Sequence, residues 1–297
     1  MAKIAVIGSA NADLAVRVAR RPLGGETVAG SAVVTSPGGK GANQAAAAAL
    51  LGGEVSFVGR VGRDGHGALL RDALRSSGVD VAALGDSEAP TSVALIVLTP
   101  DGENSIIVAG GANQQVTPDY LRQAASAWAD AALVVAQLEV PLEAVEFAAA
   151  ECRARGVRFL LNAAPAAHLP DAVVAACDPL VVNETEAAFL LGRDDTDDPE
   201  ALAAGLLALG ASSVVVTLGS RGALAASASG GLWRVPAERV PVVDTTGAGD
   251  AFVGGLATVL AAGGDLAEGL RRGTAAGACA VQGAGAQASY AGLREVR

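Results

Sequence analysis

The sequence predicts a three-layer α/β fold: a mainly parallel central sheet with helices on both faces, and a small antiparallel β lid beside it. Short apolar runs alternate with helical stretches along most of the chain. The runs lack the apolar–polar alternation of half-exposed strands, so we expect strands that are covered on both faces. Two segments interrupt this rhythm, because they contain strand patterns without intervening helices.

Six apolar runs are the expected strands of the central sheet. In chain order they span residues 3–8, 55–61, 132–139, 158–164, 179–184 and 213–219. The stretches between them have helical periodicity. The stretch 69–78 is typical: Gly78 ends the expected helix, and one face carries Leu69, Leu70, Ala73 and Leu74. Strands that alternate with helices predict βαβ units and therefore parallel pairing.

Two segments, about 12–39 and about 90–111, are the expected lid. Residues 92–110 have the pattern of two strands joined by a turn at residues 100–102, and residues 26–39 are strand-like with no helical period. We expect these pieces to form a small antiparallel sheet that stands off the main body. The 297 residues, 51% of them hydrophobic, then form one domain over residues 1–297.

The composition disfavours several classes of function. The net charge of −10 argues against nucleic acid or an anionic membrane as the main partner. The three cysteines are far apart and show no CxxC spacing, so we expect a reducing cytoplasm and no structural metal. No run approaches the roughly 18 apolar residues of a membrane span, and the short run after Lys3 is better interpreted as a strand than as a signal peptide.

Polar or glycine residues follow strand after strand of the predicted sheet. They are Asn11, Glu139, Asn162, Asn183 and Gly219. Each one alone is also explained by turn formation or helix capping. Ligands of open α/β sheets bind at the carboxyl ends of the strands. The five residues together therefore predict a site along that edge.

The segment 36–53 combines a glycine-rich bend with an alanine-rich helix. Gly38, Gly39 and Gly41 allow the backbone to approach a ligand closely, although such a bend is also ordinary before a helix. Lys40 suggests a P-loop at first sight, but the GxxxxGK[ST] spacing is absent. Asn43 is expected in the first turn of the helix, facing whatever the glycines approach.

Asn11 and Asp13 follow the first strand in place of a GxGxxG fingerprint, so a dinucleotide-binding Rossmann domain is disfavoured. An amide and a carboxylate two residues apart are suited to vicinal hydroxyl groups, because a carboxylate accepts hydrogen bonds from two of them. This pair predicts a polyol ligand.

The stretch DTTGAGDAFVGG, residues 244–255, leads from a turn into an apolar helix. The N–H groups of Gly247, Ala248 and Gly249 at the helix start are suited to a phosphate. Asp250 follows directly, where its carboxylate either caps the helix or acts as a base that accepts a hydroxyl proton. With the hydroxyl-binding pair, these features predict phosphoryl transfer to a sugar.

Five motifs in this order resemble the PfkB carbohydrate-kinase family. They are NAD at 11–13, GGKGANQA at 38–45, NETE at 183–186, TLGSRG at 217–222 and DTTGAGDAF at 244–252. The resemblance runs from about residue 4 to about residue 289. It implies an ATP-dependent carbohydrate kinase that phosphorylates D-ribose at its 5-hydroxyl. Exposed strand edges in the lid are a liability unless they are covered, which predicts a homodimer joined through the lids.

The resemblance also implies roles for individual residues. Asp250 is the implied base, and Gly247, Ala248 and Gly249 form the implied anion hole. The implied sugar-binding residues are Asn11, Asp13, Gly39, Lys40, Asn43, Glu139 and Asp250. The implied ATP-binding residues are Asn183, Thr217, Leu218, Gly219, Ser220, Arg221, Gly222, Gly249 and Thr274.

Two metal ions are implied as well. Glu186 is similar to a residue that helps to organise Mg²⁺ through water. A monovalent cation, K⁺, is implied as an activator beside the anion hole. Its implied ligands, several of them backbone carbonyls, are Asp244, Thr246, Ala280, Gly283, Gly285 and Ser289.

Other functions remain open on the sequence. The same machinery serves a kinase of another sugar or nucleoside, such as 2-deoxyribose, fructose or a ketodeoxy sugar acid. Aromatic residues make up only 3% of the chain, which disfavours a base-stacking nucleoside pocket. A non-catalytic sugar-binding regulatory protein would keep Asn11 and Asp13 without needing the Gly247–Asp250 turn.

Overall fold

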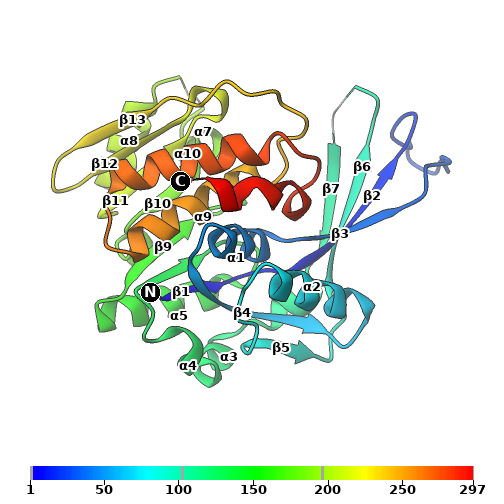
Figure 1. Cartoon of the computed structure of the whole chain (residues 1–297), viewed down its shortest axis with the longest axis horizontal. Coiled ribbons are helices and arrows are strands. Elements are labelled where there is room, and N and C mark those ends of the chain that lie inside the picture. The colour runs from blue at the N-terminus through cyan, green and yellow to red at the C-terminus, as the bar shows by residue number, and fades with distance from the viewer. Residues whose placement is uncertain (1–2, 102–103, 195–196, 297) are drawn as a thin grey trace.

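The computed structural model describes residues 3–101, 104–194 and 197–296, which form a large sheet flanked by helices and a smaller sheet at one side (Figure 1). Within these residues the large sheet has the strand order β13-β12-β11-β10-β9-β8-β1-β4-β5. Its strands are β1 (Lys3–Ile7), β4 (Glu54–Gly62), β5 (Leu84–Ser87), β8 (Leu133–Ala136), β9 (Arg158–Asn162), β10 (Leu180–Asn183), β11 (Ser213–Thr217), β12 (Ala223–Ser227) and β13 (Leu232–Val235).

The large sheet is parallel from β5 to β11, whereas β12 and β13 run antiparallel at one edge. All six strands predicted for this sheet are present. The sequence did not predict β5, β12 and β13. The run 223–227 is rich in alanine and serine, which have little preference for strands, so its pairing depends on the neighbouring strand β11.

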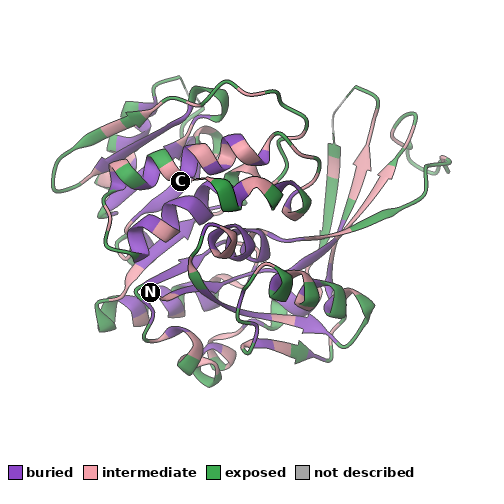
Figure 2. Cartoon of the chain, in the orientation of Figure 1, coloured by how far each residue is buried: buried purple, intermediate pink, exposed green. Residues whose placement is uncertain are grey.

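Alternate side chains of the sheet supply two cores. In β1, Ala5 and Ile7 pack on one face, and Ile4 and Val6 pack on the other. Figure 2 shows that most of the large sheet is buried. The first face is covered by α3 (Pro118–Gln123), α4 (Ala125–Trp128), α5 (Leu142–Arg155), α6 (Asp171–Val174), α7 (Glu184–Leu191) and α8 (Pro199–Ala208). The second is covered by α1 (Lys40–Leu50), α2 (Gly65–Ser76), α9 (Ala248–Ala261) and α10 (Leu266–Ala280). The structure therefore confirms the predicted three layers.

Helices α1, α9 and α10 approach each other at backbone distance. A Cβ atom added to Gly254 of α9 would lie 2.7 Å from the Cβ of Ala47 in α1. One added to Gly255 would lie 2.9 Å from the carbonyl oxygen of Arg272 in α10. Glycine is required at both positions because a larger residue would push the helices apart.

The lid is a separate sheet with the strand order β3-β2-β6-β7. Its strands are β2 (Asn11–Arg17), β3 (Val34–Gly38), β6 (Ser92–Leu98) and β7 (Asn104–Ala109). It is rich in antiparallel pairs, as predicted, but β2 and β6 are parallel. Both strands enter the lid from the main body and so run in the same direction (Figure 1).

Two details differ from the sequence prediction. The strand within residues 26–39 is confined to Val34–Gly38. In α2, Leu70 and Leu74 are buried, but Leu69 is 36% exposed because it lies about 100° around the helix from Leu70. The turn predicted at residues 100–102 includes Gly102, which lies outside the described residues.

Three short 3₁₀ helices complete the described chain: η1 (Gly111–Gln115), η2 (Gly219–Arg221) and η3 (Gln287–Glu295). Within the described residues, no helix combines the length and apolar character that crossing a membrane requires.

Candidate active site

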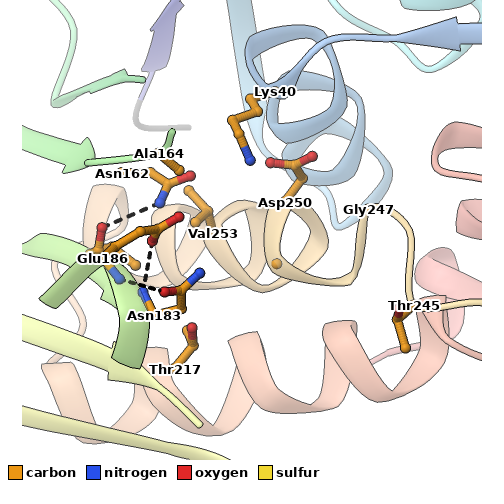
Figure 3. Close-up of a pocket in the computed structure, with 12 residues that line it drawn as sticks. Lys40, Asn162, Ala164, Asn183, Glu186, Thr217, Thr245, Gly247, Asp250 and Val253 are labelled. Carbon is orange, nitrogen blue, oxygen red and sulfur yellow. Dashed lines mark hydrogen bonds between the residues drawn. The ribbon is translucent and has the colours of Figure 1, made fainter. Parts of the chain in front are cut away.

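A cavity of about 240 Å³ opens at the carboxyl edge of the large sheet (Figure 3). Eight of the predicted site residues line it: Lys40, Asn162, Asn183, Glu186, Thr217, Gly247, Gly249 and Asp250. Figure 3 shows Lys40 and Asp250 on one side, and Asn183, Glu186 and Thr217 on the other. We call the predicted sugar-binding residues the sugar half of the site, and Asn183, Glu186, Thr217 and residues 218–222 the nucleotide half.

Asp250 is a buried carboxylate in the first turn of α9. Gly247 occupies the N-cap position, and no side chain caps the helix. The Oδ2 of Asp250 instead accepts a hydrogen bond from Asn43 Nδ2 at 2.9 Å, and its Oδ1 accepts one from Gln44 Nε2 at 3.0 Å. The structure thus excludes the capping role and leaves the carboxylate facing the cavity.

The pKa of Asp250 is raised, first by burial and to a smaller extent by the charge of Glu139. Lys40 and the hydrogen bonds from Asn43 and Gln44 oppose this rise in pKa. A carboxylate in these surroundings is a stronger base than an exposed aspartate, as a proton acceptor requires.

The turn before α9 presents unpaired N–H groups to the cavity. Ala248 N–H donates to Thr245 O and Ala251 N–H to Gly247 O, whereas Gly249 and Asp250 have no backbone acceptor among the described residues. Gly247 has a φ of 77°, which favours glycine. Tyr290 Oη donates to Gly247 O at 2.8 Å and braces the turn. This geometry is suited to an anion at the start of α9.

The sugar half brings together residues from the lid base, α1 and the end of β8. Asn11 Oδ1 accepts a hydrogen bond from Asn113 Nδ2 at 2.7 Å. Glu139 Oε2 accepts from Ser9 Oγ at 2.6 Å and from the backbone N–H of Lys40 at 3.0 Å. A Cβ atom at Gly39 would lie 2.7 Å from the backbone nitrogen of Asn11, so this approach requires glycine.

Asp13 has a strongly perturbed carboxyl group. Burial, the charge of Glu139 and the charge of Asp250 together raise its pKa to about 7. Three carboxylates therefore lie close enough to affect one another at the predicted sugar site. Such clustering of perturbed pKa values is typical of functional sites.

The nucleotide half is held by hydrogen bonds within the start of α7 and by contacts between α7, β10 and the end of β11. Asn183 Oδ1 accepts from the N–H of Glu186, and Glu186 Oε2 accepts from the N–H of Asn183, both at 2.8 Å. This capping box starts α7. The pKa of Glu186 is raised overall. Burial is the largest cause and the charge of Asp250 adds to it, whereas the hydrogen bond from Asn183 and the charge of Lys40 lower the pKa. In η2, Arg221 forms an ion pair with Glu184.

Six of the predicted nucleotide residues do not line the cavity: Leu218, Gly219, Ser220, Arg221, Gly222 and Thr274. Leu218 is buried in the hydrophobic core; its N–H donates to the carbonyl of Gly222 and its carbonyl accepts from the N–H of Arg221. Thr274 is 7% exposed, its Oγ1 has no partner among the described residues, and it does not line the cavity. Ser220, Gly219 and Gly222 lie in and after η2 at the end of β11.

The predicted cation ligands come from the segment 244–246 and from the segment 280–289, which runs from the end of α10 into η3, and the two segments meet. Asp244 Oδ1 accepts from Thr246 Oγ1 at 2.7 Å, and Asp244 Oδ2 accepts from the N–H of Gly285 at 2.8 Å. A Cβ atom at Gly283 would lie 2.8 Å from the Cβ of Ser289. Ala280 is the last residue of α10. In the described part of the chain, no group of three or more His, Cys, Asp or Glu side chains is arranged to hold a metal.

Several residues of this site were not singled out from the sequence. They are Ser9, Gln44, Asn113, Gln137 and Gln287. Gln44 lies next to the predicted Asn43, and Asn113 follows the predicted lid hairpin. These positions in the sequence only weakly indicated that the two residues belong to the site. Their partners lie more than a hundred residues away, which a sequence pattern does not reveal.

The fold and this site define a class: an α/β kinase that transfers phosphate to a small hydroxylated molecule under a β lid. Comparison with known proteins agrees, because residues 1–291 match the model of the pfkB family carbohydrate kinases. The chain belongs to this family and is an ATP-dependent carbohydrate kinase of the ribokinase-like fold.

Several relatives and a structure with the same fold are named as kinases of ribose or deoxyribose. The chain is 39% identical to a ribokinase of Schizosaccharomyces pombe, over 100% of this chain and 97% of that one. It is 37% identical to a deoxyribokinase of Salmonella typhimurium, over 98% and 96%. The structure of Arabidopsis thaliana ribokinase with ribose and ATP matches with a TM-score of 0.90 and 34% identity, covering 99% and 98%.

Proposed function

We propose that the protein transfers the γ-phosphoryl group of ATP to the 5-hydroxyl of D-ribose, giving ribose 5-phosphate and ADP. The observation that carries the proposal is the position of Asp250: a buried carboxylate beside unpaired N–H groups, on a helix that also contacts the sugar half. The similarity to ribokinases over the whole chain supports ribose as the acceptor.

In the proposed reaction Asn11, Asp13, Gly39, Lys40, Asn43 and Glu139 orient the sugar. Asp250 accepts the proton of the attacking hydroxyl, while the N–H groups of the Gly247–Gly249 turn and the cationic Lys40 stabilise negative charge on the phosphoryl group. Asn183, Thr217, residues 218–222, Gly249 and Thr274 border the nucleotide in this proposal. Positioning and charge stabilisation are the main requirements of phosphoryl transfer.

We infer that two cations assist. The carboxylate of Glu186 lines the same cavity as Asp250 and is suited to water-mediated Mg²⁺, which prefers oxygen ligands and neutralises phosphate charge when bound. The two segments with Asp244, Thr246, Ala280, Gly283, Gly285 and Ser289 offer oxygen atoms to K⁺. Tyr290 links the second segment to the Gly247 carbonyl, which gives a route from that site to the anion-binding turn.

We also infer a homodimer joined through the lids. The lid exposes several large apolar side chains: Val34, Leu95, Ile106, Ile107 and Val108. Ile107, for example, is 65% exposed. Exposed apolar strands at the edge of an open sheet tend to aggregate unless another chain or segment packs against them. Light scattering at micromolar concentration tests this; a monomer whose lid is intact contradicts it.

A cytoplasmic location is part of the same proposal. Cys152, Cys177 and Cys279 are all free thiols, as a reducing compartment permits. Burial raises the pKa of Cys152 to about 12, so this thiol is unreactive at neutral pH.

An ATP-coupled assay over a panel of pentoses, hexoses and nucleosides tests the proposed function. We expect the highest kcat/KM with D-ribose. A higher value with 2-deoxyribose reassigns the enzyme to the activity of its deoxyribokinase relative, and no turnover of any sugar refutes the kinase proposal. Equal rates in K⁺ and Na⁺ refute the selective cation site alone.

A further inference from the structure

Side-chain amides hold both carboxylate oxygens of Asp250. Asn43 Nδ2 donates to Oδ2 at 2.9 Å, and Gln44 Nε2 donates to Oδ1 at 3.0 Å. Both donors lie in the first half of α1, and Asp250 lies in the first turn of α9. Asn43 is an expected sugar contact, whereas Gln44 is not among the predicted binding residues.

Gln44 has no exposed polar atom to offer a substrate. It is 1% exposed, and its Nε2 donates a second hydrogen bond to Asn162 Oδ1 at 2.9 Å. Its Oε1 accepts from Gln137 Nε2 at 2.6 Å, and Gln137 is fully buried. Both N–H bonds and the carbonyl of Gln44 are thus used inside the protein.

This pattern fixes which way the Gln44 amide faces. If the amide were flipped, its carbonyl would face two oxygen acceptors, on Asp250 and Asn162, and its NH₂ would face the NH₂ of Gln137. Unpaired buried polar groups of this kind are costly, so the observed orientation is strongly favoured. Gln137 therefore acts on Asp250 through Gln44.

A neutral amide donor favours the ionised form of a carboxylate. Burial raises the pKa of Asp250, whereas the hydrogen bonds from Asn43 and Gln44 lower it. The two bonds also prevent the carboxylate from rotating, because each oxygen has its own donor. A base needs both properties: it must be ionised before the reaction and aimed at the hydroxyl.

Other titratable groups face Asp250 from the surrounding elements. They are Lys40 on α1, Asp13 on β2, Glu139 after β8, Glu186 on α7 and Tyr290 on η3. All of them are retained when Gln44 alone is replaced. A difference between wild type and a Gln44 variant therefore reports on Gln44.

We propose that Gln44 is a positioning residue for phosphoryl transfer, which holds the Asp250 carboxylate ionised and directed at the acceptor hydroxyl. In that step the hydroxyl gives its proton to Asp250, its oxygen bonds to the γ-phosphorus, and the bond from that phosphorus to the β–γ bridging oxygen breaks to release ADP. The inference rests on the proposed kinase function.

The test compares Gln44→Met, which keeps the length of the side chain and removes the amide, with wild type. We expect kcat to fall about 10- to 100-fold at pH 7, with the KM values for sugar and ATP within about threefold. The acid limb of the kcat profile should move up by about one pH unit, so that the loss shrinks as the pH rises. Gln44→Glu, with a like charge beside Asp250, should move the limb further.

Ser56→Ala is the matched control. Ser56 is 2% exposed and donates to Ala127 O at 2.7 Å, so its loss removes a buried hydrogen bond on β4 without touching the site. We expect its pH profile to match wild type. An unmoved acid limb in Gln44→Met, or a raised sugar KM with unchanged kcat, overturns the inference. If Gln44→Met does not fold, Gln137→Met serves instead, with a smaller shift in the same direction.

A second measurement separates this inference from the proposed function. The pKa of Asp250 is followed by NMR on protein with ¹³C-labelled aspartate carboxyls, assigned with Asp250→Asn. A higher Asp250 pKa in Gln44→Met supports the inference that Gln44 keeps this carboxylate ionised, even if the wild type phosphorylates no sugar. Normal turnover by wild type with an unchanged Asp250 pKa in the variant overturns the inference alone.

Discussion

The sugar half of the site is held by hydrogen bonds between residues far apart in the chain, whereas the bonds of the nucleotide half join residues that are closer in sequence, at most 37 positions apart. Asn43 and Asp250 are 207 positions apart, and Asn11 and Asn113 are 102 apart. Asn183 and Glu186 are three apart. A small sugar offers few contacts, so its site must be rigid before binding, whereas a nucleotide is large enough to be bound by exposed turns and helix ends.

The comparison predicts that changes in the sugar half affect the chemical step most. Asp250→Asn keeps the size of the side chain but removes the base, so kcat should fall about a hundredfold to ten-thousandfold. Equilibrium binding of the sugar, measured by calorimetry, should change little because Asn still forms hydrogen bonds. Turnover within a few fold of wild type would contradict the role of Asp250 as the base.

Asp13→Asn should weaken binding of the sugar without weakening binding of ATP. It replaces a charged acceptor of hydroxyl hydrogen bonds, so the sugar KM should rise about 10- to 100-fold, while the ATP KM stays within about threefold. Steady-state kinetics with each substrate varied in turn measures both. Asp72→Asn on the exposed face of α2 is the control for loss of a carboxylate. Equal effects on the sugar KM and the ATP KM would contradict the division of the site into a sugar half and a nucleotide half.

The same Asp13→Asn change should stabilise the free protein at alkaline pH. The pKa of Asp13 is raised from 3.8 to about 7, so the folded state holds this proton more tightly than the unfolded state. Its contribution to stability is complete below about pH 4 and is lost as pH rises to about 7. The variant should therefore be more stable than wild type at pH 8 by roughly 1–3 kcal/mol.

Urea unfolding of both proteins at pH 5 and pH 8 measures this difference. The advantage of the variant should be smaller at pH 5, where Asp13 of the wild type is largely protonated. An equal difference at both pH values would show that the Asp13 carboxyl does not titrate in this range.

The nucleotide half should respond to a local change with a smaller loss. Asn183→Ala removes the cap of α7 and should lower the free energy of unfolding by about 0.5–2 kcal/mol. The ATP KM should rise a few fold, with the sugar KM unchanged. Asp265→Ala is the matched control, because Asp265 caps α10 with a hydrogen bond of 2.7 Å to the Glu268 N–H and does not line the cavity. It should cost similar stability without changing the ATP KM.

The two halves also differ in how far they were predictable from sequence. The strands before Asn11, Glu139 and Asn183 are apolar runs, so the edge of the sheet and its polar residues were predictable. The turn at Gly247 was predictable because its glycines are local. By contrast, the bond from Gln44 to Asp250 depends on how α1 and α9 pack, and no residue near either position in the sequence signals it.

The cap-or-base question at Asp250 shows the same limit. Sequence placed this residue in the first turn of a helix, where both roles are chemically sound. The structure excludes the capping role, because Gly247 takes the N-cap position and the amides of α1 bind the carboxylate; the role as base is the proposal tested above. The strands β12 and β13 were missed for a related reason, since their pairing with β11 defines them better than their composition does.

The contact of Gly254 with Ala47 has a consequence for how this enzyme can change over evolution. Because α9 meets α1 at backbone distance, the spacing between Asp250 and Asn43 is set by two main chains, and no side-chain substitution adjusts it gradually. At the lid base, Gly39 also approaches the main chain of Asn11, whereas Asn113 of η1 contacts Asn11 through its side chain. New substrate preferences should therefore arise by substitution around Asn113 and β2, with the α1–α9 pair inherited unchanged.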